Sequence, residues 1–308
     1  MNSGQFYSHG KLLLTGEYLV LDGAMALGLP TQKGQFLEVK QTANQKTITW
    51  KSILEDGSTW LDVSFSWDEM LNFHCSENSP EAKKLIEIFQ HIAQLKPELF
   101  QGDLGYKFES RLEFNKNWGL GSSSTLINNL AQWASIDAFQ LQFKIFGGSG
   151  YDIACAQHST AIIYQKQENQ INVEPAQFQP NFKDQLFFVY LNQKKNSREA
   201  IAHYKALNPF VKEEAIQRVN DFTQQILNTT SLTDFENLLT AHEKVMGSLL
   251  EEFPIKQRLF QDYPRAIKSL GAWGGDFILA TGGEAEKEYF RNKSYTIILD
   301  FQEMILSA

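Results

Sequence analysis

Residues 117–134 read NWGLGSSSTLINNLAQWA and place two glycines and three serines directly before a helix-like run. Apolar side chains recur at helical spacing in that run, at Leu126, Ile127, Leu130, Trp133 and Ala134. Amide side chains are expected to fill the opposite face, at Asn128, Asn129 and Gln132. A helix start carries unpaired backbone N–H groups at the positive end of the helix dipole, which suits a phosphate. An ordinary glycine turn with a serine cap has the same composition, so the stretch alone leaves both interpretations open.

The composition supports a large core and argues against nucleic acid. The chain has 308 residues, of which 43% are hydrophobic, enough for one large domain or two of ordinary size. The formal net charge is −8, so a nucleic-acid partner is not expected. A phosphate compound could still bind where helix N-termini and a few lysines make the potential locally positive.

Cysteine usage and the N-terminal residues indicate a cytoplasmic protein. Cys75 and Cys155 are far apart and neither belongs to a C-x-x-C pair, so free thiols are expected rather than a zinc or redox site. The opening MNSGQFYSHG lacks the basic and apolar segments of a signal peptide. No apolar run approaches the length of a membrane span, and no membrane partner is expected.

Short strands and a helix are expected before the glycine–serine stretch. KLLL and YLVL, at 11–14 and 18–21, are apolar runs separated by a turn, and 46–67 is also strand-like. A helix is expected from 80 to 95. The alternation of 103–114 predicts a strand that leads into the stretch.

A polar segment with two prolines, residues 166–183, predicts a domain junction. It would separate an N-terminal domain, 1–165, from a C-terminal domain, 184–308. Both halves mix strands with helices, which indicates the α+β class.

The C-terminal half combines apolar strands with two long helices. The apolar runs LFFVYL and FILAT predict strands. Helices are expected at 209–228 and 234–253, and Thr233 with Glu236 has the spacing of a capping box for the second.

Four glycine-bearing motifs follow one another along the chain. They are SHGKLLLTGEY at 8–18, GLGSSS at 119–124, SGYDIA at 149–154 and GAWGGD at 271–276. A single glycine loop is a weak signal, whereas four of them in strand and helix contexts are far more specific.

This set resembles the motifs of the GHMP kinases, the superfamily of galactokinase, homoserine kinase, mevalonate kinase and phosphomevalonate kinase. The family patterns P-G-K with G-E-[HY], G-L-G-S-S-[AS], S-G-x-D or G-D-[IVL]-A, and G-A-G-G-G-D correspond to the four segments in order. The resemblance spans nearly the entire chain. Details of the first and last motifs look most like the mevalonate and phosphomevalonate kinases, and G-Y-D-I-A at 150–154 resembles a bacterial branch with that signature.

The resemblance implies a fold and an activity. The fold would be the α+β, two-domain GHMP kinase architecture, with a ribosomal protein S5 domain 2-like N-terminal domain that binds the nucleotide and a ferredoxin-like C-terminal domain. The activity would be transfer of the γ-phosphoryl group of ATP, with Mg²⁺, to a small-molecule acceptor such as mevalonate or phosphomevalonate, as in isoprenoid biosynthesis. A homodimer is compatible with this interpretation.

The resemblance also assigns roles to individual residues. Asp152 would be the catalytic base and Lys11 would neutralise charge near the moving phosphoryl group. The phosphates of ATP would be wrapped by Gly119, Leu120, Gly121, Ser122, Ser123 and Ser124. Ser123 would also bind Mg²⁺ through its hydroxyl. Substrate-binding positions would be Glu17, Gly271, Ala272, Gly274, Gly275 and Ser197.

The match departs from the family pattern at several points. Leu270 stands where phosphomevalonate kinases have Ser or Thr, and Trp273 replaces a glycine, where it would crowd a phosphate or line an altered acceptor pocket. The glutamate that binds Mg²⁺ in mevalonate kinases has no counterpart between Ser123 and Asp152.

These departures leave alternatives open. The protein could be a sugar or homoserine kinase of the same superfamily, or a nucleotide-binding protein without catalysis. A phosphomevalonate acceptor would require several cations, and the available ones are Lys194, Lys195, Arg198 and Lys268.

Overall fold

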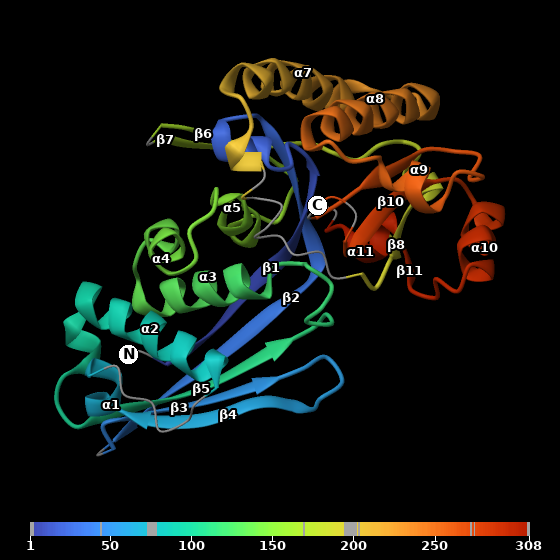
Figure 1. Cartoon of the computed structure of the whole chain (residues 1–308). Coiled ribbons are helices and arrows are strands. Elements are labelled where there is room, and N and C mark those ends of the chain that lie inside the picture. Colours follow the sequence, from blue (N-terminus) through green and yellow to red (C-terminus); the bar gives the residue numbers. More distant parts are fainter. Residues whose placement is uncertain are drawn as a thin grey trace. The chain divides into compact units, whose positions relative to one another are not determined.

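The computed structural model describes residues 3–43, 45–72, 79–168, 170–193, 202, 204–271, 273 and 275–306. Both halves of the described chain combine strands with helices, which confirms the predicted α+β class (Figure 1). Within the described residues, no helix is both long and apolar enough to cross a membrane.

The chain divides into two compact units. Unit 1 consists of Met1–Gly10, Lys33–Lys116 and Gly121–Gln157, and unit 2 of Lys11–Gln32, Asn117–Leu120 and His158–Ala308. The long strands β1 (Gly4–Thr15) and β2 (Ala26–Ala43) therefore contribute residues to both units. The domain boundaries at 165 and 184 stay a prediction, because this grouping rests on different segments.

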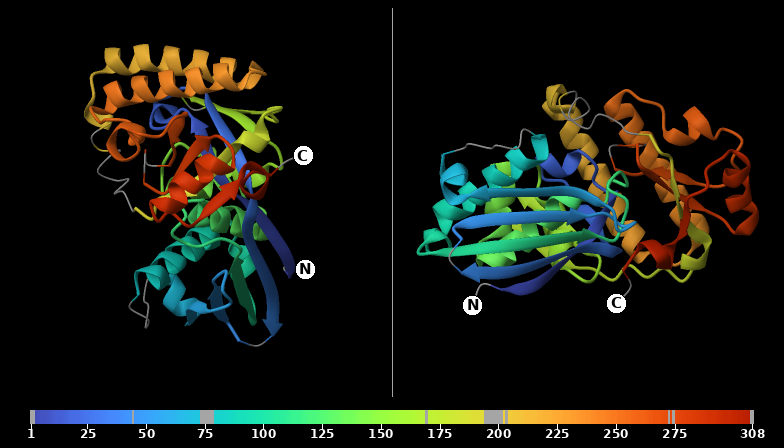
Figure 2. Two further views of the ribbon diagram at one scale, coloured as in Figure 1. Left: turned by 90° about the vertical axis from the view of Figure 1, so that its right-hand side faces the viewer. Right: turned by 90° about the horizontal axis from the view of Figure 1, so that it is seen from below.

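Unit 1 is a layer of strands covered by helices. Its strands are β4 (Thr59–Ser66), β3 (Thr47–Ile53), β5 (Leu104–Leu112) and the second half of β2, in that spatial order, together with the first part of β1, which pairs with β2. Strand β3 runs parallel to β5 and the other neighbours are antiparallel. Its helices are α1 (Trp67–Leu71), α2 (Pro80–Leu95), η2 (Pro97–Phe100), α3 (Ser122–Ala134), α4 (Ala138–Ile145) and α5 (Tyr151–Gln157). Figure 2 shows the helices lying behind the strands in the view from below.

Aromatic residues fill the core between these two layers. Phe89 of α2 packs against Trp50, Phe108 and Trp133, which come from β3, β5 and α3. These side chains are at most 4% exposed. The predicted helix 80–95 is confirmed, and Ser79 caps it by accepting a hydrogen bond from the backbone N–H of Ala82 at 3.2 Å.

Two residues of the amide face of α3, Asn128 and Asn129, are buried. Ser8 donates to Asn129 Oδ1 at 2.7 Å, Asn128 donates to Ser8 Oγ at 2.8 Å, and Asn129 donates to the carbonyl of Gln35 at 2.8 Å. A buried amide must be hydrogen-bonded, and these bonds fasten α3 to β1 and β2.

Unit 2 contains a four-stranded antiparallel sheet. Its strands are β8 (Leu186–Tyr190), β9 (Ile267–Ser269), β10 (Phe277–Thr281) and β11 (Ile298–Asp300). The spatial order β11-β8-β10-β9 places the four strands as 4-1-3-2, which is the ferredoxin-like arrangement. Helices α7 (Pro209–Asn228) and α8 (Leu232–Leu250) connect β8 to β9, with α9 (Ile255–Leu259) after them. Helices α10 (Glu284–Asn292) and α11 (Phe301–Met304) flank β11 in the sequence.

The rest of unit 2 is built around the first half of β2. Residues Ala26–Gly28 pair with β6 (Ile162–Gln167), which pairs with β7 (Gln170–Pro175). The unit also holds the short helices η1 (Leu19–Asp22) and η3 (Lys183–Gln185).

Two local predictions in unit 2 were wrong. YLVL at 18–21 is not a strand, because Tyr18 and Gly23 both adopt positive φ and enclose the 3₁₀-helix η1. The cap of α8 is Ser231 rather than Thr233, since its side chain accepts from the N–H of Asp234 at 3.3 Å. Glu236 instead accepts a hydrogen bond from Arg265 Nε at 2.8 Å, so it is not part of a capping box.

The aromatic core of unit 1 predicts a large cost for truncating Phe89, which is fully buried. Phe89→Ala is expected to lower the free energy of unfolding by about 3–5 kcal/mol, because it removes ring contacts and leaves a cavity. Phe210→Ala is the matched control, since Phe210 is 81% exposed. Urea unfolding should show a change within about 0.5 kcal/mol for the control. Equal effects of the two substitutions would contradict the packing described.

Candidate functional site

Helix α3 begins without the side-chain cap expected of an ordinary serine-capped helix. Its N-cap is Gly121, with φ 87°, and no side chain caps the helix. Ser124 Oγ donates to the carbonyl of Gly121 at 2.9 Å, and the N–H of Thr125 donates to the same carbonyl at 3.0 Å. Within the described residues, no side chain accepts from the N–H groups of the first turn, where Ser123 is exposed. This turn therefore offers backbone donors and a positive dipole end to an anion.

Asp152 lies in the first turn of α5, next to α3 within unit 1. Gly150, with φ 95°, makes the turn into α5, and its carbonyl accepts from the N–H of Ile153 at 3.0 Å. Gln157 donates to Asn128 Oδ1 at 3.1 Å, which joins the end of α5 to the middle of α3. The half-buried Asp152 and the serines of α3 therefore stand on two helices that pack together.

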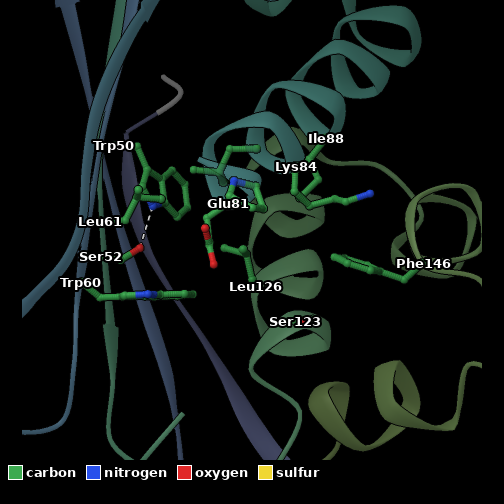
Figure 3. A pocket seen from close by; sticks show the side chains of 12 residues that line it. Trp50, Ser52, Trp60, Leu61, Glu81, Lys84, Ile88, Ser123, Leu126 and Phe146 are labelled. Atoms are coloured by element: carbon green, nitrogen blue, oxygen red, sulfur yellow. Dashed lines mark hydrogen bonds between the residues drawn. The ribbon is translucent and has the colours of Figure 1, made fainter. Parts of the chain in front are cut away.

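An apolar pocket of about 220 Å³ opens beside Ser123 in unit 1. Strands β3 and β4 form one wall and helices α2 and α3 the other, as Figure 3 shows. Its lining is mostly apolar and aromatic: Trp50, Ser52, Trp60, Leu61, Pro80, Glu81, Lys84, Leu85, Ile88, Ser123, Leu126 and Phe146. Sequence reasoning missed this pocket, and its only signal was a set of tryptophans in the strand-like text of 46–67.

In unit 2, the first and second motifs meet at the end of β1. The backbone N–H of Lys11 donates to the carbonyl of Leu120 at 3.0 Å, which ties the strand to the glycine loop. Lys11 itself is half-buried.

The last motif meets the same loop through Asp276. Gly119 has φ 67°, and a Cβ there would overlap the carboxylate of Asp276. A Cβ at Gly271 would lie 3.4 Å from Asp276 Oδ2. Unit 2 thus brings three sequence motifs together. Ala272, Gly274 and Ser197 lie outside the described residues.

The side chain of Trp273 is buried in the core. This position fits neither of the two roles considered for it, crowding a phosphate or lining an acceptor pocket. It is fully buried, with φ 56°, in a cluster with Tyr18, Leu19 and Met246. Its indole therefore serves as a core side chain of unit 2. Leu270, the other departure from the family pattern, is 1% exposed.

Glu17 belongs to a buried ionic cluster in unit 2 that also contains His242, Glu243 and Lys268. The Lys268 ammonium donates to Glu17 Oε1 and to the carbonyl of Ser269, the latter at 2.7 Å, and lies 3.1 Å from Glu243 Oε1. Glu243 Oε2 accepts from Ser269 Oγ at 2.6 Å. His242 Nε2 lies 3.5 Å from Glu17 Oε2. No member is more than 3% exposed, so Lys268 has no access to solvent.

Burial dominates the protonation of this cluster. It raises the pKa of Glu17 to about 7, although the Lys268 ammonium acts in the opposite direction. Burial, with a contribution from the Lys268 charge, holds the pKa of His242 well below its usual range. Burial alone would lower the pKa of Lys268, but the Glu17 and Glu243 carboxylates outweigh it and raise that pKa.

These shifts predict how stability depends on pH. A carboxyl group whose pKa is raised by folding stabilises the fold fully below its unfolded pKa, and that stability is lost as pH rises through about 7. The unfolding free energy of the wild type relative to Glu17→Gln should therefore fall by roughly 2–3 kcal/mol between about pH 5 and about pH 8. His242 is present in both proteins, so its opposite trend largely cancels in this difference.

Urea unfolding at several pH values checks this prediction. Glu284→Gln is the control, because Glu284 is 72% exposed and should give a difference that does not vary with pH. Parallel pH profiles for the wild type and Glu17→Gln would show that Glu17 ionises normally.

Comparison with known proteins places the chain by its structure. No protein-family model and no curated protein matches its sequence. The structure resembles mevalonate kinase from Methanococcus jannaschii, with a TM-score of 0.71, 15% identity and 99% of each chain covered. It resembles Lactococcus lactis galactokinase in complex with galactose, with a TM-score of 0.70, 15% identity and coverage of 99% of this chain and 94% of the other.

A third similar structure is Streptococcus pneumoniae phosphomevalonate kinase in complex with phosphomevalonate and AMPPNP. Its TM-score is 0.69 at 14% identity, with 96% of this chain and 99% of the other covered. These solved structures belong to one superfamily, the one that the four motifs indicated, and the likeness extends over nearly the whole chain. The protein therefore has the fold of the GHMP kinases.

Proposed function

We propose that the protein is an ATP-dependent small-molecule kinase that phosphorylates a mevalonate-like or phosphomevalonate-like acceptor. The observation that carries this proposal is the start of α3. Gly121 replaces a side-chain cap there, and the first-turn N–H groups stand beside an apolar pocket. A nucleoside triphosphate combines the two groups that such a place suits, an anion and a planar base.

The nucleotide would bind with its phosphates at the glycine–serine loop, residues 119–124, and its base in the apolar pocket. Glycines allow the phosphates to approach the backbone closely. Ser123 joins the two parts, because it stands in the first turn of α3 and also lines the pocket.

Asp152 and Lys11 are the proposed catalytic pair. Asp152 would accept the proton of the acceptor hydroxyl as that oxygen forms a bond to the γ-phosphorus. The bond from that phosphorus to the bridging oxygen would break and ADP would leave. Lys11 would offset the negative charge that spreads over the transferring group. Helix α5 supports the role of Asp152, since it holds this carboxyl half-buried beside the helix of the phosphate loop.

The residues present fit a magnesium ion held mainly by the nucleotide. Within the described residues, no group of three or more His, Cys, Asp or Glu side chains could hold a metal. The Ser123 hydroxyl is exposed, and oxygen ligands with several waters suit Mg²⁺. Ser123 and the phosphates would hold the ion, which neutralises phosphate charge when bound.

The acceptor is assigned to the region of the last motif. Glu17, Gly271, Ala272, Gly274, Gly275 and Ser197 remain the proposed substrate-binding positions. Glu17 is 1% exposed and is bound to Lys268, so we expect it to support the acceptor site from below the surface. The burial of Lys268 removes it from the cations that a phosphomevalonate phosphate would need, and Lys194, Lys195 and Arg198 lie outside the described residues. The described part of the chain therefore favours mevalonate as the acceptor.

An ADP-release assay tests the proposed function. Mg-ATP is supplied with mevalonate, phosphomevalonate, homoserine, galactose and related sugars in parallel. Turnover with mevalonate is the expected result, and turnover with homoserine or galactose alone would move the protein to that branch. Nucleotide binding without turnover on any acceptor would point to a non-catalytic protein.

Asp152→Asn is expected to reduce turnover with the identified acceptor by roughly 10²–10⁴-fold, because the amide cannot take the proton. Asp137→Asn is the matched control. Asp137 caps α4 by accepting from the N–H of Phe139 at 2.8 Å, a bond that asparagine can also make. Circular dichroism should confirm that both variants fold. Full activity in Asp152→Asn would remove Asp152 from the mechanism.

Gly119→Ala is expected to weaken Mg-ATP binding and turnover by tenfold or more, on the order of 1–2 kcal/mol. A Cβ at this position overlaps the Asp276 carboxylate and would displace the phosphate loop. Gly102→Ala separates this effect from backbone strain, because Gly102 also has positive φ, 74°, but faces open space. Calorimetric titration of both variants checks the prediction, and equal losses would assign the effect to strain alone.

A further inference from the structure

The pocket beside Ser123 has the size and walls of a site for one planar ring system. Its volume of about 220 Å³ lies below the range of about 300–1,000 Å³ common for drug-sized ligands. A base would fit inside, and a ribose with its phosphates would have to lie outside. Trp60 of β4 provides a flat wall and is 41% exposed despite its size.

The Trp60 ring also has a cationic neighbour, Lys116. Lys116 Nζ lies 4.9 Å from the centroid of this ring, within range of a cation–π interaction. Lys116 does not line the pocket. Trp60 lines the pocket, so its ring can stack on a base, and such stacking is sequence-tolerant because every base has a π-face. Stacking on Trp60 therefore cannot by itself select a base.

The polar side chains that line the pocket differ in whether they already have a hydrogen-bond or ionic partner. Ser52 Oγ accepts the indole N–H of Trp50 at 2.8 Å. Lys84 donates to Glu87 and lies 5.5 Å from the ring centroid of Phe146. Glu81 has no hydrogen bond or ion pair within the part of the chain that the structure describes. Figure 3 shows its carboxylate directed into the space between Trp60 and Leu126.

The position of Glu81 serves the helix terminus and the pocket at the same time. It lies in the first turn of α2, where an acidic side chain interacts favourably with the helix dipole. The interaction with the helix dipole does not require the Glu81 side chain to line the pocket. Ser79 already caps this helix. Glu81 is exposed in the free protein, but a base stacked on Trp60 would cover its carboxylate, which would then require a donor there.

We propose, building on the kinase function above, that Glu81 selects the base of the nucleotide by accepting a hydrogen bond from the exocyclic amino group of adenine stacked on Trp60. An ionised carboxylate is purely an acceptor, so only a base that presents an N–H donor satisfies it. The bond is charge-assisted and therefore stronger than a bond between neutral groups. A base without a donor at this place leaves the carboxylate unpaired, which costs affinity.

Two nucleotides that differ only in the amino group isolate this interaction. ATP and purine riboside triphosphate are titrated calorimetrically, with Mg²⁺, into the full-length protein. The wild type is expected to bind ATP roughly 10- to 100-fold more tightly than the analogue. Glu81→Ala is expected to bind both with the same affinity, weaker than ATP on the wild type and at least as tight as the analogue on the wild type, because no carboxylate is left unpaired.

Two further variants separate base selection from stacking and from general charge effects. Trp60→Ala should weaken both nucleotides by a similar factor, since stacking does not depend on the amino group. Glu98→Ala is the matched control, because Glu98 is also an acidic first-turn residue, on η2, but does not line the pocket. It should keep the full preference for ATP.

The outcomes distinguish this proposal from the function on which it rests. Equal binding of ATP and the analogue by the wild type, or an unchanged preference in Glu81→Ala, would overturn the role of Glu81 and leave the kinase function standing. Failure of the wild type to bind either nucleotide would overturn the proposed function itself. Loss of the preference in Glu81→Ala but not in Glu98→Ala supports base selection by Glu81.

Discussion

The burial of α3 on both faces is the constraint on which the candidate site depends. Apolar residues such as Trp133 face the aromatic core, while Asn128 and Asn129 face β1 and β2 through hydrogen bonds. A helix held on one face only could rotate about its axis or slide along it. Buried amides that must keep their partners fix both motions, because each misplacement would leave a polar group unpaired at a cost of about 1–3 kcal/mol. The direction of the helix N-terminus, and with it that of the proposed phosphate-binding turn, follows from that attachment.

In unit 2 a buried ionic cluster holds the segments in place, as buried amide side chains do in unit 1. Lys268 on β9 is held by two carboxylates, one directly after β1 and one on α8. Removing one member of such a group would leave a buried charge without compensation, so the three segments are expected to keep their places together. The last glycine motif begins three residues after Lys268, so the place of its first residue is fixed by the cluster. Trp273, packed in the core, adds a second attachment inside the motif itself.

The sequence allows the elements to be predicted better than the contacts. Helix α3 and the strand before it follow from periodicity, and the ferredoxin-like order of β8 to β11 from the family resemblance. The burial of Asn129 could not be predicted, since its partner Ser8 is 121 residues away. Glu17 and Lys268 are 251 residues apart. YLVL was misjudged because a positive φ at Tyr18 is unusual for a bulky residue and leaves no mark in hydrophobicity. The pocket requires side chains from β3, β4, α2 and α3 and has no linear pattern.

The close approach of Gly119 to Asp276 carries a consequence for how such a chain can evolve. A side chain at 119 and a carboxylate at 276 exclude one another, since the first Cβ carbon would already overlap Oδ2. The two positions lie in separate motifs, yet position 119 cannot gain a side chain while Asp276 keeps its carboxylate. Substitutions at the pair should be strongly non-additive, and related chains that lack the glycine should also carry a smaller residue in place of the aspartate. The two motifs are then expected to change together in evolution, although they are far apart in the sequence.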